Sequence, residues 1–265
     1  MGLKTMNQEQ INTLAQELHQ AMRQRKTLAP VSERFPDVTI EDAYQISQRF
    51  LSLRLGEGEK VVGKKIGLTS KVVQDMLGVH QPDFGFLTDA MQYESGAAIP
   101  FEQSLIQAKS EGEIAFVLKQ DLVGPNITPA DVLSATDYVA ACFEIVDSRI
   151  DNWQIKIQDT IADNASCGVF VMGDKADPID VDFENCKMVI RNKGKIVAEG
   201  QGSAALGSPL NCVAWLANAL AEYQVPLKAG EVILSGSLAA MIPCQFDDDM
   251  QMEIEGIGQA SYRFI

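Results

Sequence analysis

The chain has 265 residues, enough for one large domain or for one domain with a helical appendage. Its hydrophobic fraction of 46% and charged fraction of 22% are ordinary for a soluble globular protein. The net charge of -14 argues against binding to nucleic acid, which requires phosphate neutralisation by Lys and Arg, and against binding to an anionic membrane surface.

The cysteines point to a reducing compartment. Their number is odd, no two have CxxC spacing, and most have apolar neighbours, so we expect buried free thiols in a cytoplasmic protein. The N-terminus does not resemble a signal peptide, and no apolar run approaches the roughly 20 residues of a membrane-spanning helix. The five cysteines are Cys142, Cys167, Cys186, Cys212 and Cys244.

Residues 1–60 are predicted to form a helical N-terminal region. Asn7 is a suitable cap for a first helix with an apolar stripe from Ile11 to Met22. Thr39 is a suitable cap for a second helix, which Gly56 ends, and Pro30 and Pro36 bound a loop between the two. Such stripes are usually packing faces, so we interpret the region as a cap or a subunit contact.

Residues 61–265 form the second predicted unit, in which strands outnumber helices. The strands do not alternate regularly with helices, which favours an α+β fold over a doubly wound one. Two helices have clear start signals, Thr128-Pro129 and Ser208-Pro209, and the second reaches about Tyr223. The strands are expected at 61–66, 111–119, 138–147, 187–191, 195–198, 231–235, 250–255 and 260–264.

Three glutamates are the strongest indication of a functional site. Glu111 and Glu113 lie two residues apart on a predicted strand, so their side chains share one face. Glu144 lies in a second apolar strand segment. Two adjacent carboxylates repel each other unless a cation lies between them or one takes up a proton. Without Cys or His nearby, three carboxylates favour Mg²⁺ or Mn²⁺ over Zn²⁺; the alternative is a solvated strand face.

Other polar residues are weaker candidates. Lys64 and Lys65 are neighbours on a strand and point to opposite faces, so we expect one to face solvent and the other to point inward. An inward lysine can pair with a substrate carboxylate or relay a proton, although both could also serve only solubility. Asp83 lies in the turn-like segment Gln81-Pro-Asp-Phe-Gly85, and Asp163-Asn-Ala-Ser166 is another polar segment; turn chemistry explains either one about as well as a site does.

Several motifs together resemble the hydratase/decarboxylase branch of the fumarylacetoacetate hydrolase superfamily. The resemblance runs over nearly the whole chain and implies the β-rich fold of that superfamily, a mixed β-roll or sandwich, in residues 61–265. The motifs that carry it are Gly63-Lys-Lys-Ile-Gly-Leu-Thr69, Gln81-Pro-Asp-Phe-Gly85, Glu111-Gly-Glu-Ile-Ala-Phe116, Phe143-Glu-Ile-Val-Asp-Ser-Arg149, Asp159-Thr-Ile-Ala-Asp-Asn-Ala-Ser166, Leu206-Gly-Ser-Pro209, Val213-Ala-Trp-Leu-Ala217 and Ile233-Leu-Ser-Gly-Ser237.

The resemblance also implies the roles of individual residues. It assigns metal binding to the three glutamates, with Mg²⁺ or Mn²⁺ as the ion. It places Lys65 and Asp83 in the catalytic site and Ser166 near the substrate. The decarboxylases of this branch share the glutamates and the lysine, but tend to have an apolar residue at the position of Asp83. Hydration needs an acid/base group to handle water, so Asp83 favours a hydratase. Relatives often have Arg where this chain has Lys109.

The activity that the resemblance implies is the addition of water to 2-hydroxypenta-2,4-dienoate (2-oxopent-4-enoate), giving 4-hydroxy-2-oxopentanoate in the meta-cleavage of aromatic compounds. Three alternatives remain open: decarboxylation of 4-oxalocrotonate, hydration of a longer dioic acid, and a non-catalytic subunit that stabilises such a decarboxylase. The expected partners are a small-molecule substrate, further copies of the chain in a homo-oligomer, and a 4-oxalocrotonate decarboxylase.

Overall fold

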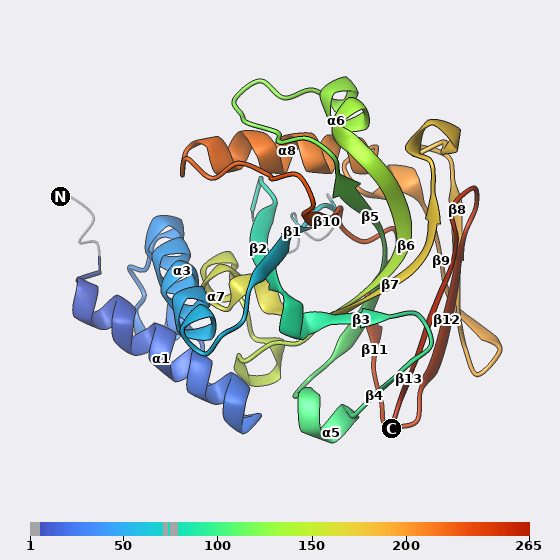
Figure 1. The fold of residues 1–265 in the computed structure, drawn as a ribbon. Coiled ribbons are helices and arrows are strands. Elements are labelled where there is room, and N and C mark those ends of the chain that lie inside the picture. The colour runs from blue at the N-terminus through green and yellow to red at the C-terminus, as the bar shows by residue number, and fades with distance from the viewer. Residues whose placement is uncertain (1–5, 71–73, 75–78) are drawn as a thin grey trace.

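The computed structural model describes residues 6–70, 74 and 79–265. Figure 1 shows a strongly curved large sheet in the middle of the molecule, a smaller sheet against its outer side and a group of N-terminal helices at the opposite end. Both sheets contain parallel and antiparallel pairs, and helices do not alternate with strands along the chain. The prediction of an α+β, β-rich fold is therefore confirmed.

The large sheet carries the residues that later form the site. Its strand order is β2-β1-β10-β5-β6-β7-β3, and β11 pairs with β5 outside this order. β1 runs parallel to β10, whereas β5 and β6 form a long antiparallel pair at its centre. The strands are β1 (Val61–Gly67), β2 (Asp83–Thr88), β3 (Gln92–Glu94), β5 (Lys109–Leu118), β6 (Thr136–Val146), β7 (Cys167–Ala176), β10 (Val232–Leu234) and β11 (Ile242–Pro243).

The smaller sheet packs on the convex side of β5, β6 and β7. Its order is β4-β13-β12-β8-β9, with β4 (Ala97–Ile99), β8 (Lys187–Asn192), β9 (Lys195–Gln201), β12 (Asp249–Ile254) and β13 (Gly258–Phe264). The Phe143 and Tyr262 rings meet edge to face across the interface, 5.0 Å between centroids. Gly112 faces this core, where a Cβ would lie 2.4 Å from the Met188 sulfur. The alternation of β5 thus puts Gly112 into the core and its two glutamate neighbours onto the concave face.

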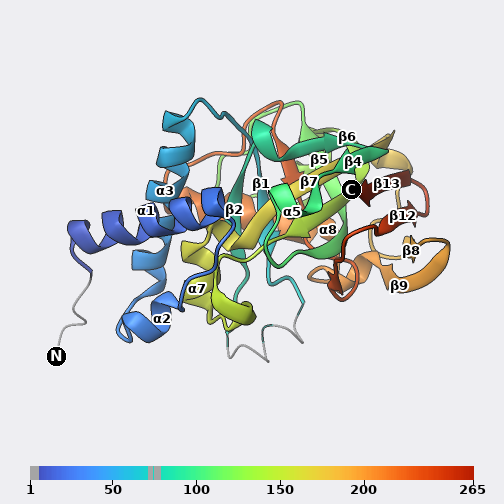
Figure 2. The same ribbon diagram turned by 90° about the horizontal axis from the view of Figure 1, so that it is seen from below.

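The N-terminal helices have the capping chemistry predicted for them. α1 (Gln8–Gln24) and α3 (Ile40–Gly56) each begin with a complete capping box, at Asn7 and Thr39. They pack on each other, and α3 also packs on α7 (Ile157–Ala162); Figure 2 shows them grouped at one end of the molecule. The loop predicted between Pro30 and Pro36 is wrong in part, because α2 (Val31–Arg34) forms a helical turn there.

Two buried hydrogen bonds explain why the chain forms the helical turn α2. Ser32 donates to Asp159 from its backbone N–H and its hydroxyl, at 2.8 and 2.7 Å, and both residues are buried. This long-range contact fixes the turn after Pro30, whose ring suits the start of a helix. It also joins the N-terminal region to the helix that borders the site.

The remaining helices lie between strands. α8 (Pro209–Ala221) begins as predicted, with Pro209 in its first turn. Contrary to the expectation from the sequence, the stretch Gly202–Ala221 is long and apolar enough to cross a membrane by length and composition. In the fold it is divided between a short 3₁₀ turn and the 13-residue α8, whose rise of about 20 Å is less than the hydrocarbon core of a bilayer. The helices are α5 (Phe101–Ser104), α6 (Pro129–Ala135), α8 (Pro209–Ala221) and the 3₁₀ turns η1 (Asp89–Met91), η2 (Asp151–Trp153), η3 (Asn164–Ser166), η4 (Pro178–Asp180) and η5 (Gly202–Ala204).

Candidate metal centre and active site

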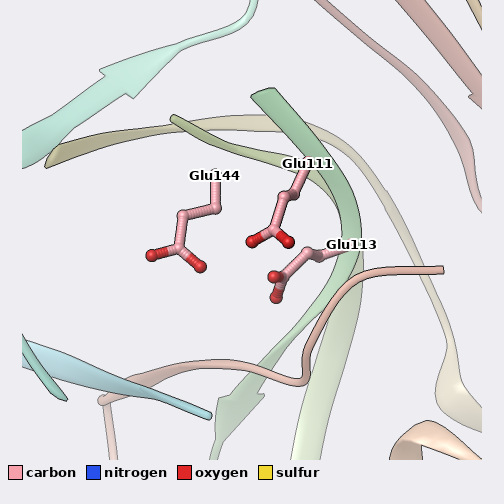
Figure 3. A group of neighbouring side chains, drawn as sticks. All are labelled: Glu111, Glu113 and Glu144. Carbon is pink, nitrogen blue, oxygen red and sulfur yellow. The ribbon is translucent and has the colours of Figure 1, made fainter. Parts of the chain in front are cut away.

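Three glutamate carboxylates converge on the concave face of the large sheet. Glu111 on β5 lies directly opposite Glu144 on β6, and Glu113 follows two residues later on the same face. One carboxylate oxygen from each lies within 4.8 Å of the others. Figure 3 shows the three side chains pointing toward a common point. Strand alternation and antiparallel register therefore bring together the residues that the sequence singled out.

The hydrogen bonding of these carboxylates fits a bound cation. Glu113 Oε2 accepts from the Gly236 N–H at 2.8 Å, but its Oε1 and Glu144 Oε2 are buried without a partner among the described residues, and Glu144 Oε1 has the ammonium group of Lys65 at 3.2 Å. Buried ionised oxygens are costly without a partner. Oxygen ligands of this kind are the ones that hard divalent cations prefer, so the donor set suits Mg²⁺ or a similar ion.

The charge of the cluster perturbs its acidity. Burial, followed by the negative charge of Glu144, raises the pKa of Glu111 to about 7. Burial together with the charges of Glu144 and Glu111 raises the pKa of Glu113 well above its ordinary value. Three such carboxylates cannot all ionise at neutral pH without a compensating positive charge.

Lys65 supplies one compensating charge. It lies on β1, and its Nζ is 3.2 Å from Glu144 Oε1, with both side chains buried. Burial opposes the charged form, but the negative charge of Glu144 outweighs it and raises the pKa of Lys65 above its ordinary value. The expectation that one of the two adjacent lysines faces solvent is wrong: Lys64 is also buried, and it binds Glu231 at 2.7 Å on the other face of the strand.

Asp83 lies beside Lys65 because of a glycine. The residue is the first of β2, opposite Gly67 of β1, so the turn interpretation of this segment is wrong. A Cβ on Gly67 would lie 2.2 Å from Asp83 Oδ1 and 3.3 Å from Lys65 Nζ. Only glycine leaves room for both groups. Asp83 Oδ1 is buried without a hydrogen bond from a described residue, and burial raises its pKa while Lys65 opposes the shift.

Ser166 reaches the site from a left-handed turn. Asn164, Ala165 and Ser166 have φ values of 54°, 51° and 53°, a conformation that L-residues adopt at a cost. The Ser166 hydroxyl lies 3.3 Å from that of Thr160 on α7, and both border the same cavity. The sequence analysis did not single out Thr160. This residue lies six positions before Ser166, and the two hydroxyls meet only because α7 ends in this turn.

A buried arginine holds the turn at both ends. Arg149 donates to the Asp163 carboxylate from its backbone and its Nε, and to the carbonyls of Asp163 and Cys167 at 2.6 and 2.7 Å. Asn164 adds two hydrogen bonds to the backbone of Phe86 on β2, at 2.8 and 2.9 Å. The turn is thus tied to the strand that begins with Asp83. These roles were also missed, because they depend on contacts between distant segments.

A cavity of about 560 Å³ lies over these groups, a volume within the range of small-molecule sites. Its polar lining includes Lys65, Asp83, Glu111, Thr160 and Ser166. Much of the remaining wall is apolar. It is formed by Ile66, Leu68, Val146, Trp153, Ile155, Ala165, Ala204, Ala239, Ala240, Met241 and Pro243. The arrangement can bind a small anionic molecule beside a divalent cation and move protons to it.

Comparison with known proteins gives relatives over the full length of the chain. A 2-hydroxyhexa-2,4-dienoate hydratase of Comamonas testosteroni is 56% identical over 256 residues, covering 96% of this chain and 97% of the relative. A 2-hydroxypent-2,4-dienoate hydratase of Pseudomonas putida is 59% identical over 221 residues, covering 83% of this chain and all of the relative. The chain is therefore similar to proteins named as hydratases.

Solved structures show the same fold. The 4-oxalocrotonate decarboxylase of Pseudomonas putida G7, complexed with magnesium and adipate, has a TM-score of 0.96 at 35% identity, covering 99% of this chain and all of that one. A fumarylpyruvate hydrolase of Pseudomonas aeruginosa, complexed with Mn²⁺ and pyruvate, has a TM-score of 0.62 at 12% identity, covering 76% of this chain and 88% of that one. The model of the fumarylacetoacetate (FAA) hydrolase C-terminal family matches residues 63–265. On these grounds the chain belongs to the fumarylacetoacetate hydrolase family.

Proposed function

We propose that the protein is a metal-dependent hydratase that adds water to 2-hydroxypenta-2,4-dienoate (2-oxopent-4-enoate) and forms 4-hydroxy-2-oxopentanoate. One observation carries the proposal: a buried acid, Asp83, borders one cavity together with Lys65 and Glu111, and Glu111 belongs to a cluster of three converging carboxylates. The names of relatives at 56% and 59% identity support the substrate class.

Glu111, Glu113 and Glu144 are the proposed metal ligands, with Mg²⁺ or Mn²⁺ as the ion. The unpartnered Oε1 of Glu113 and Oε2 of Glu144 support this assignment, as does the magnesium named in the solved structure of a 35% identical protein. When bound, the cation supplies Lewis-acid stabilisation of the negative charge on a 2-oxo acid.

Asp83 is the proposed acid/base. Because burial raises its pKa, it holds a proton more readily than an ordinary aspartic acid and can donate it to C5 of the dienoate as the enol proton is lost. Its carboxylate then accepts a proton from the water that attacks C4 and returns it to C3. The proton released by the enol passes to solvent, from which Asp83 regains its proton at the end of the cycle. Lys65 stabilises the carboxylate form of Asp83 between these transfers, and Ser166 donates a hydrogen bond to the substrate.

A second candidate is decarboxylation of 4-oxalocrotonate. The observation in its favour is the TM-score of 0.96 with a 4-oxalocrotonate decarboxylase. Decarboxylation requires an electron sink but no group that handles water, so it leaves the buried Asp83 without a role. A non-catalytic subunit, in turn, has no use for three converging carboxylates. Both points favour the hydratase.

The test offers both substrates to the purified protein with Mg²⁺ or Mn²⁺ and identifies the products by NMR. We expect loss of dienoate absorbance with formation of 4-hydroxy-2-oxopentanoate, and no CO₂ from 4-oxalocrotonate. CO₂ release with no hydration would identify a decarboxylase instead.

We also propose a cytoplasmic homo-oligomer that can associate with a 4-oxalocrotonate decarboxylase. The five free thiols support a reducing compartment. Ile196 and Val197 are 55% and 42% exposed on β9, at the edge of the smaller sheet, which supports contacts with other chains. Light scattering coupled to size exclusion, with and without the decarboxylase, checks both associations.

A further inference from the structure

The charges around the cavity do not balance for an anionic ligand. The site contains four carboxylates, those of Glu111, Glu113, Glu144 and Asp83. Lys65 forms a salt bridge with one of them, Glu144. With a divalent cation added and Asp83 protonated, as proposed above, the three glutamates, Lys65 and the cation sum to zero. The site then has no net positive charge to attract a 2-oxo carboxylate, so a further positive group nearby would favour its binding.

Lys109 is in the right place to supply that charge. It lies on β5 in register with Val146 and Pro243, and it borders the cavity. Residues 109, 111 and 113 point to the same face of β5. Lys109 therefore lies next to Glu111 on that face, with a Cα spacing of about 7 Å. No carboxylate in the described part of the chain forms a salt bridge with Lys109 within 4.0 Å. Among the described residues, its charge is therefore not neutralised by an ion pair.

An aromatic ring holds this lysine at the cavity wall. Lys109 Nζ lies 4.1 Å from the centroid of the Trp153 ring, a cation–π contact that orders the ammonium group without neutralising it. The indole N–H of Trp153 donates to the Gln107 carbonyl at 2.9 Å. Trp153 also has φ 57°, which is unusual for a bulky residue. The ring is fixed by these restraints and acts as a support for the side chain above it.

We propose that Lys109, supported by Trp153, binds the C1 carboxylate of the 2-oxo acid and so determines that the site accepts anionic 2-oxo acids. The assignment rests on the proposed function, because it assumes a cation on the three glutamates. Lys109 is the charged residue next to Glu111 on this face of β5 and borders the same cavity, so its ammonium group is the proposed partner of a carboxylate bound beside the glutamate cluster. The rest of the substrate then meets the apolar wall, which suits an uncharged chain.

The test measures binding in the absence of turnover. Wild type, Lys109→Met, Lys109→Arg and the surface control Lys195→Met are titrated with Mg²⁺ alone, and then, saturated with Mg²⁺, with 2-oxopentanoate and 2-oxohexanedioate by calorimetry. We expect Lys109→Met to weaken both acids at least tenfold, Lys109→Arg to remain within threefold of wild type, and Lys195→Met to have no effect. Mg²⁺ affinity is expected to stay unchanged or to rise in Lys109→Met.

Three other results would contradict the assignment of Lys109, and each has a different meaning. Equal affinity of Lys109→Met and wild type for 2-oxopentanoate means that Lys109 does not bind the carboxylate. A loss confined to 2-oxohexanedioate places Lys109 at the far end of the ligand. Failure of the wild type to bind Mg²⁺ refutes the metal centre, and this assignment with it, and the metal titration reveals that case separately.

Discussion

Glu113, Glu144 and Asp83 are buried, and Glu111 is partly exposed; Asp83 and Glu111 border the cavity. Burial, and after it repulsion from neighbouring carboxylates, raises the pKa values of Glu111, Glu113 and Asp83, whereas Lys65 stays charged. The metal-free site therefore holds protons that a bound cation must displace, because only ionised carboxylates are good ligands. Metal affinity should consequently rise as the pH increases through about 7, the pKa of Glu111.

The same shift predicts how metal-free protein responds to pH. The folded pKa of Glu111 is about 7 against an ordinary value of 4.5, so the folded state binds the proton more tightly than the unfolded state. Its contribution to the free energy of unfolding is fully present below pH 4.5 and is lost as the pH rises to about 7. After allowance for solvent screening this loss is about 2 kcal/mol.

Urea denaturation of chelator-treated protein between pH 5 and 8 measures the loss. Glu111→Gln cannot titrate, so in this variant the decrease of unfolding free energy over the same interval should be smaller. If the wild type and Glu111→Gln have the same pH dependence, Glu111 does not have a raised pKa.

Gly67 offers a test of how closely Asp83 must approach Lys65. An added methyl group would lie 2.2 Å from Asp83 Oδ1, so Gly67→Ala must displace the carboxylate. We expect kcat to fall about 100-fold, since small misplacements of a catalytic group cost factors of this size. The matched control is Gly56→Ala at the end of α3, where a Cβ meets nothing within 4 Å. Hydration rates and melting temperatures of both variants measure the effect; normal kcat in Gly67→Ala would show that the close approach is not needed.

At the scale of elements, the site depends on a turn that is held from outside. The left-handed residues 164–166 connect α7 to β7, and they bind β2 through Asn164. Arg149 binds the residues on both sides of the turn, Asp163 and Cys167. The strain of three left-handed residues is thus maintained by a buried ion pair with several hydrogen bonds.

Removing one partner of the Arg149–Asp163 ion pair should lower the free energy of unfolding more than removing both partners. Arg149→Met leaves Asp163 buried without its partner, and we expect the free energy of unfolding to fall by about 3 to 5 kcal/mol. Arg149→Met combined with Asp163→Leu removes both charges, and part of that loss should be recovered. Denaturant unfolding of the two single variants and the double variant measures the coupling. Additive losses would mean that the two side chains act independently.

At the scale of the whole molecule, capping and strand alternation made much of the fold predictable. Asn7 and Thr39 marked the starts of helices, and the row of Glu111 and Glu113 followed from strand geometry alone. Lys64 could not be assigned in this way, because its partner Glu231 is 167 residues distant along the chain. The strand position of Asp83 and the turn before Ser166 likewise depend on long-range contacts, which local sequence patterns do not contain.

We propose that residues 1–60 are a helical region that supports a catalytic part formed by residues 61–265. Leu14, Leu18 and Phe50 are buried in the same apolar cluster as residues of α7 and α8. A fragment of residues 61–265 should therefore lose cooperative thermal unfolding, because a face of its core is exposed. Circular dichroism melting of the fragment beside the full chain tests this expectation. A fragment that melts like the full chain would show that the catalytic part folds independently.

The most direct test of the central claim compares Asp83→Asn and Glu111→Gln in one experiment, which measures Mg²⁺ affinity by calorimetry and hydration by dienoate absorbance. The account predicts that Asp83→Asn binds Mg²⁺ nearly as tightly as the wild type but does not hydrate the dienoate, whereas Glu111→Gln loses both properties. Hydration at the wild-type rate by Asp83→Asn, or unchanged Mg²⁺ affinity in Glu111→Gln, would contradict it.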